Sequence, residues 1–130
     1  MVAASPAEVS IQGVAQIALS VSDIAAATAF YRDTLRLPLL FEVPGLSFFD
    51  LGGVRLMLST GGKPGGRGTL IYLKVSDLAT THAALAAAGV TFEQVPHVVG
   101  KTPTTEVWLA ILSDPDGNPL GLMSEAPLPA

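Results

Sequence analysis

The fold is decided by two closely similar segments, Val21-Ser22-Asp23-Ile24-Ala25 and Val75-Ser76-Asp77-Leu78-Ala79. Each segment follows a run of alternating apolar residues and leads into an Ala-rich stretch with apolar residues at helical spacing. The repeat therefore extends to a whole strand–helix unit. Because duplicated units of this kind pair to bury their sheet faces, we expect a ligand site where the two copies meet.

The first copy is predicted to form a strand, a helix and three further strands. The first strand covers 14–21, and Asp23 then caps a helix that runs to Leu37, since a side-chain oxygen at this position accepts a bond from a free helical amide. Pro38 ends the helix. Turn signals at Pro44-Gly45 and Gly52-Gly53 separate the three strands that follow, which are expected near 39–43, 46–51 and 54–59.

The second copy repeats this order. A strand is predicted over 70–75, and a helix from Leu78 to Ala88 is closed by Gly89 in a left-handed conformation. Three strands are then expected near 91–95, 105–112 and 120–124. The polar stretch 96–104 between two of them is either a lid over the site or a plain surface loop.

We therefore predict an α+β fold with two βαβββ modules. The expected organisation is a flexible N-terminal tail over 1–12, a single domain over 13–124 and a C-terminal tail over 125–130. Within the domain, module one covers 13–60, a Gly-rich linker covers 60–68 and module two covers 69–124.

Composition narrows the class of protein. With 49% hydrophobic and 14% charged residues, the chain is globular and has room for one core. It contains no cysteine, which excludes disulfides and thiolate chemistry. A formal net charge of -4 with 7 basic residues argues against nucleic acid and anionic membranes as partners. We see no signal peptide or membrane span, and we expect a cytoplasmic protein.

Three motifs together resemble the vicinal oxygen chelate superfamily, which includes glyoxalase I, extradiol dioxygenases and bleomycin-resistance proteins. They are the repeated Val-Ser-Asp segment, Phe30-Tyr31-Arg32-Asp33, and Asp114-Pro115-Asp116-Gly117-Asn118 before the last strand. The last motif is also a good turn sequence, and we interpret it as a turn. The resemblance implies sheets that curl around a cleft, helices packed outside, and a homodimer.

The resemblance also implies a metal site, at which this sequence departs from the family. Catalytic members hold a divalent metal through His or Gln, Glu, His and Glu side chains on the first and last strands of each module. The matching positions are Gln16, Met57, Leu70 and Gly121. Three of these four offer no metal ligand, whereas a divalent ion needs three or four donors. We therefore expect no metal and no cofactor.

The cleft floor is predicted from the strand faces that point away from the helices. This floor is apolar with few polar groups, as is typical of a small-molecule pocket. Val107 and Ile111 suit the helix side of their strand, which would turn Glu106, Trp108 and Ala110 inward. Either Phe48 or Phe49 lines the cleft. The expected lining residues are Gln16, Phe48, Arg55, Met57, Leu70, Tyr72, Trp108, Gly121 and Met123.

Two functions from different classes fit this cleft. The first is metal-independent binding of an apolar or aromatic small molecule, with Trp108 stacking on the ligand or simply packing in the core. The second is a metal-independent isomerase, lyase or hydrolase that uses Glu106 and Tyr72 as acid–base groups. Against this second role, a cleft-side tyrosine such as Tyr72 is more often a hydrogen-bonding wall residue. Glu106 is more readily explained as a partner of Arg55 or Lys74, or as a residue exposed at a strand end.

Overall fold

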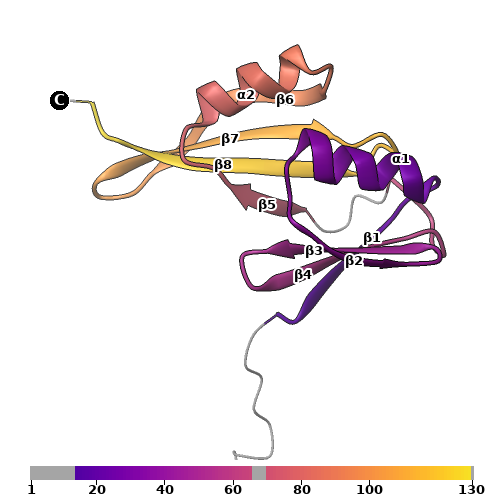
Figure 1. Cartoon of the computed structure of the whole chain (residues 1–130). Helices are drawn as coiled ribbons and strands as arrows, with labels where there is room; N and C mark the ends of the chain where they lie inside the picture. Colours follow the sequence, from indigo (N-terminus) through magenta and orange to yellow (C-terminus); the bar gives the residue numbers. More distant parts are fainter. Residues whose placement is uncertain (1–13, 66–69, 130) are drawn as a thin grey trace, which may run out of the picture.

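The computed structural model describes residues 14–65 and 70–129. It confirms the α+β fold and the βαβββ order of each half (Figure 1). In the first half the elements are β1 (Gln16–Ser20), α1 (Ile24–Ala29), η2 (Phe30–Thr34), β2 (Leu39–Val43), β3 (Leu46–Leu51) and β4 (Val54–Ser59). In the second half they are β5 (Ile71–Lys74), α2 (Leu78–Ala87), β6 (Thr91–Lys101), β7 (Thr105–Ser113) and β8 (Pro119–Pro127).

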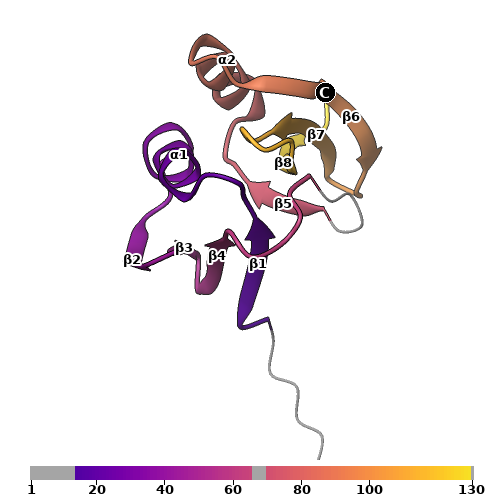
Figure 2. The same ribbon diagram turned by 90° about the vertical axis from the view of Figure 1, so that its right-hand side faces the viewer.

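The strands form two separate four-stranded mixed sheets, with the orders β1-β4-β3-β2 and β5-β8-β7-β6. In each sheet the first strand of the module pairs in parallel with the last, and the remaining pairs are antiparallel. Figure 2 shows α1 above the first sheet and α2 above the second, on the same side of the molecule. The opposite face of each sheet therefore has no helix over it.

One hydrophobic core joins the two modules on the helix side. Successive side chains of a strand point to opposite faces of the sheet, so every second side chain points toward the helices. Tyr31 and Phe49 are fully buried in this core. Its other buried members are Val21, Ala27, Leu56, Leu58, Leu78, Leu85, Ala110, Leu112, Leu120 and Leu122.

The first helix differs from the prediction of one regular helix up to Leu37. Asp23 caps it as expected, accepting a bond from the Ala26 amide at 3.1 Å. The second half of the helix widens into the π-helical η2, where Leu35 N bonds to Phe30 O at 3.0 Å. The chain then leaves the helix through Arg36, which has a left-handed φ of 60°.

The predicted polar loop over 96–104 is mostly strand, so that prediction is wrong. β6 runs on to Lys101, and only 102–104 connect it to β7. Three register shifts interrupt its pairing with β7, one of them between Gln94 and His97 around Pro96. Such bulges accommodate a proline, which has no amide hydrogen for the ladder, and they hide the alternation that marks a strand.

Parts of the predicted domain organisation fall outside the described residues. These are the N-terminal tail over 1–12 and the end of the linker at 66–68. At the other end, β8 continues to Pro127, so the segment 125–127 is strand rather than tail.

Candidate functional site

The face of the first sheet that lies opposite α1 is called the first open face here. Leu56 and Leu58 of β4 point into the core, so Arg55, Met57 and their cross-strand neighbours point away from it. Strand register arranges this face in three rows. The rows are Ala18, Met57, Phe48 and Phe41; Gln16, Arg55 and Asp50; and Ser20, Ser59, Leu46 and Val43.

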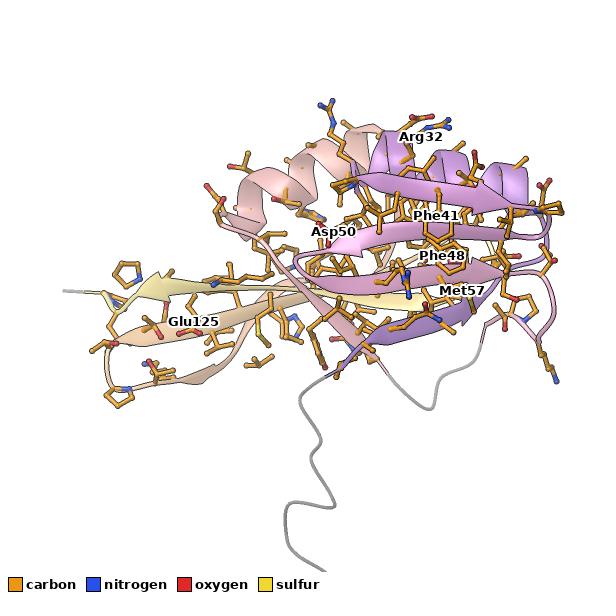
Figure 3. All side chains as sticks on the ribbon, turned by 60° about the horizontal axis from the view of Figure 1, so that its bottom comes forward. Arg32, Phe41, Phe48, Asp50, Met57 and Glu125 are labelled. Atoms are coloured by element: carbon orange, nitrogen blue, oxygen red, sulfur yellow. The ribbon has the colours of Figure 1, made fainter. Side chains whose placement is uncertain are left out.

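An aromatic pair lies at the centre of the first open face. The rings of Phe41 and Phe48 stack with centroids 4.4 Å apart and planes inclined by 21°. The guanidinium carbon of Arg55 lies 5.6 Å from the centre of the Phe48 ring, within the range of a cation–π contact. Figure 3 shows Phe41, Phe48 and Met57 side by side across three strands. Phe41 is 45% exposed whereas Phe48 is buried, so the Phe41 ring, supported by Phe48, offers a flat apolar surface to a ligand.

Gln16 is already held by its neighbours on this face. Its Nε2 donates to Met57 Sδ at 3.7 Å, and its Oε1 accepts a bond from Arg55 Nε at 3.1 Å. The first and second family ligand positions are therefore adjacent in space. They supply only one amide and one thioether, beside a guanidinium cation that repels a metal ion.

The second open face is the face of the other sheet that lies opposite α2. Tyr72 lies across Gly121, and a Cβ added to Gly121 would come within 2.3 Å of the Tyr72 ring. Both face the same side as Met123, whereas Leu120 and Leu122 enter the core. The fourth family ligand position therefore carries no side chain and is covered by an aromatic ring, and Leu70, just before β5, offers no donor.

The residues present do not fit the metal that the family motif implies. Within the part of the chain that the structure describes, no group of three His, Cys, Asp or Glu side chains is placed to hold a metal ion. The four ligand positions together provide the oxygen of Gln16 and the sulfur of Met57, which is too few donors to offset the dehydration of a divalent ion.

A pocket of about 450 Å³ lies where the modules meet. Asp50 of the first open face and Tyr72 of the second both line it, together with Ile17, Val54 and Ile71. Most of its other lining residues pack against the core, so the pocket lies at the edge between the two modules, and the Phe41–Phe48 pair lies outside it.

The predicted orientation of β7 is wrong. Ala110 is fully buried in the core and Trp108 packs against the same core, so Glu106, Trp108 and Ala110 face α2 rather than the cleft. Leu109 pairs with Met123 on the second open face instead. The prediction failed because β7 carries apolar residues on both of its faces, so alternation alone does not tell which face meets the helix.

The predicted lining residues therefore lie on two different faces of the molecule. Gln16, Phe48, Arg55 and Met57 share the first open face, and Tyr72, Gly121 and Met123 share the second. Glu106 lies on the other side of the second sheet from Tyr72, so these two candidate catalytic residues do not share a pocket.

Sequence analysis missed Phe41. A two-residue turn at Pro44-Gly45 pairs Val43 with Leu46 and, two residues further, Phe41 with Phe48, as the structure shows. The position of the turn therefore predicts that Phe41 lies across from Phe48.

Residues 13–122 match the model of the Glyoxalase/Bleomycin resistance protein/Dioxygenase superfamily. The chain belongs to this superfamily. Among curated proteins, none matches this sequence. No helix of the described residues is long and apolar enough to cross a membrane.

Solved structures agree with this membership. A superfamily member from Sphaerobacter thermophilus is 27% identical, with a TM-score of 0.72 over 87% of this chain and 97% of its own. TnmS3, an antibiotic binding protein from a Streptomyces species, is 29% identical, with a TM-score of 0.72 over 91% of this chain and 99% of its own. Lactoylglutathione lyase from Agrobacterium tumefaciens, 23% identical, shares the fold with a TM-score of 0.71 over 88% and 94%.

Proposed function

We propose that the two open faces bind an apolar or aromatic small molecule without a metal ion. The observation that carries this proposal is the exposed Phe41 ring stacked on the buried Phe48, with Arg55 beside the pair, at the place where the family motif would put metal ligands. Stacked rings offer a flat apolar surface, and a guanidinium at the edge of such a surface orients a polar or anionic substituent of the ligand.

The similarity to TnmS3 supports binding rather than metal catalysis. That protein is described as an antibiotic binding protein, and the two chains align over nearly their whole lengths. A molecule with a flat aromatic part matches the chemistry of the first open face. We infer that the ligand of this chain carries such a part.

We further propose that two copies of the chain close the site as a homodimer. In one chain the two sheets remain separate, and Phe41, Val43 and Tyr72 are each 45–47% exposed on the open faces. A ligand gains most from this apolar surface when both of its sides are removed from water. A second copy placed over the open faces would supply the missing wall.

Titration with the neutral fluorescent probe N-phenylnaphthylamine tests the binding site. We expect saturable binding that does not change when EDTA is added. Phe41→Ala should weaken it about three- to tenfold, because aromatic stacking contributes about 0.5–1.5 kcal/mol. The matched control is Leu40→Ala, which removes an exposed apolar side chain next to Phe41 that lies outside the aromatic stack.

Three results would contradict the proposal: no saturable binding, loss of binding with EDTA, or equal weakening by both substitutions. Native mass spectrometry of protein purified without chelator tests the remaining parts. A metal-free dimer that retains an organic adduct is the expected species. A stoichiometric divalent ion would overturn metal-independent binding, and a monomer with bound probe would overturn the shared site.

A further inference from the structure

A second pocket, of about 420 Å³, lies on the helix side of the second sheet at the start of α2. Figure 1 shows β7 and β8 running on past this end of the helix toward the C-terminus. The strand positions that line this pocket are the cross-strand pairs Trp108 with Ser124 and Glu106 with Ala126.

Three polar groups in this pocket have no hydrogen-bond partner among the described residues. Ser124 is only 8% exposed, lines the pocket and makes no hydrogen bond through its hydroxyl. The indole N–H of Trp108 and the carboxylate of Glu106 also lack partners there. No buried side-chain nitrogen or oxygen atom of the described residues lacks a hydrogen-bond partner, so these three polar groups open into the pocket, where a ligand can bond to them.

The charge of the pocket selects the kind of ligand. Asp77 and Glu106 both line it, and no lysine or arginine is among its described lining residues. Asp77 caps α2, and hydrogen bonds from Thr80 lower the pKa of its carboxyl group, so it is ionised at neutral pH. The pocket therefore favours a cation over an anion.

We propose that this pocket binds an organic amine with an apolar body. The ammonium group would donate to the Glu106 carboxylate and to the Ser124 hydroxyl, and the apolar body would lie against the indole of Trp108. The pocket volume falls within the range of about 300–1,000 Å³ that is typical of small-molecule sites. Glu106 and Trp108 lie on the helix side of the sheet, and at Ser124 the pocket adjoins a hollow that Tyr72 and Met123 of the second open face line.

The intrinsic fluorescence of the full chain tests this proposal directly, because Trp108 is its only tryptophan. Phenethylamine is the probe, and phenethyl alcohol is the neutral molecule of nearly the same shape. We expect phenethylamine to change the fluorescence of Trp108 saturably. Phenethyl alcohol should bind at least about tenfold more weakly, a difference of about 1.4 kcal/mol.

Two isosteric substitutions test whether the Glu106 carboxylate binds the ammonium group. Glu106→Gln should weaken phenethylamine binding about tenfold and leave phenethyl alcohol unchanged. The matched control Glu42→Gln removes an exposed charge on β2, outside the pocket, and should change neither. Far-UV circular dichroism of each variant checks that it is folded.

The proposal is overturned if phenethylamine leaves the fluorescence of Trp108 unchanged, if the alcohol binds as well as the amine, or if Glu106→Gln behaves like Glu42→Gln. Its failure is distinguishable from failure of the open-face proposal. Phenethylamine should not displace N-phenylnaphthylamine from the open faces. Phe41→Ala tests only the N-phenylnaphthylamine titration, and Glu106→Gln tests only the phenethylamine titration.

Discussion

The phenol of Tyr31 donates a 2.8 Å hydrogen bond to Asp114 Oδ2, which joins the helix of module one to the β7–β8 turn of module two. Both residues are buried. Asn118 completes the connection by donating to Asp114 Oδ2 at 2.8 Å and to the Ser20 carbonyl at 2.9 Å. The turn at 114–118 is therefore the polar link between the modules, and it fixes how the two open faces lie relative to each other.

Removing the Tyr31 hydroxyl should destabilise the protein. In Tyr31→Phe, the buried carboxylate of Asp114 loses a donor, and a hydrogen bond to a charged group contributes about 1.5–3 kcal/mol. Urea denaturation followed by circular dichroism measures the free energy of unfolding. The control is Tyr72→Phe, because Tyr72 is 47% exposed and its hydroxyl has no partner among the described residues. Equal stabilities for the two variants would show that the Tyr31 bond does not stabilise the fold.

Tyr31 should also cause the free energy of unfolding to fall at high pH. Burial first, and then the charge of Asp114, raise the pKa of Tyr31 well above its ordinary value of about 10. Since the folded-state pKa is the higher one, this stabilisation is complete below about pH 10 and is lost progressively above it.

Absorbance spectroscopy of Tyr72→Phe measures this effect, because Tyr31 is then the only tyrosine. Tyrosinate absorbance should appear only together with loss of the native circular dichroism signal. A tyrosinate signal near pH 10 in a protein that is still folded would contradict the raised pKa.

Gly121→Ala should destabilise the second open face. The added Cβ would lie 2.3 Å from Cδ1 of Tyr72, so the ring must leave its position, at a cost of about 1–3 kcal/mol. Thermal or urea denaturation measures this cost, and combining the change with Tyr72→Ala should remove most of it. Gly100→Ala is the control, since a Cβ there meets no atom within 4 Å. Full additivity of the two substitutions would mean that the ring and Gly121 do not interact.

Arg36→Gly should stabilise the protein slightly. Arg36 has a φ of 60°, which costs a residue with a Cβ about 1–2 kcal/mol. The greater conformational freedom of glycine in the unfolded chain offsets about 0.5–1 kcal/mol of this. The free energy of unfolding should therefore rise by about 0.5–1 kcal/mol. Arg32→Gly, within the regular turns of η2, should instead destabilise. A loss of stability in Arg36→Gly would indicate that the arginine side chain stabilises the end of η2.

Much of the architecture was predictable because its signals are local. The Asp23 and Asp77 caps act on amides within three residues, and the turns at Pro44-Gly45 and Gly52-Gly53 act within four. The repeat of these signals implied two βαβββ modules, which the structure confirms. That Met57, Leu70 and Gly121 stand at family ligand positions is what the resemblance implies, and their side chains offer at most one thioether.

The orientation of β7 was not predictable in this way. Alternation divides Glu106, Trp108 and Ala110 from Val107, Leu109 and Ile111, but both sets contain large apolar residues. Which set meets α2 depends on how the helix crosses the sheet, a long-range property. For the same reason Glu106 and Trp108 were assigned to the wrong face.

Local chemistry in the sequence therefore determined most elements and their order. Packing between distant segments decided the rest, including the Tyr31–Asp114 bond, the extension of β6 through its bulges, and the side of the second sheet that Trp108 faces. Caps and turns depend on a few residues that are neighbours in the sequence. The burial of a side chain and its hydrogen-bond partners depend on which distant segment packs against it.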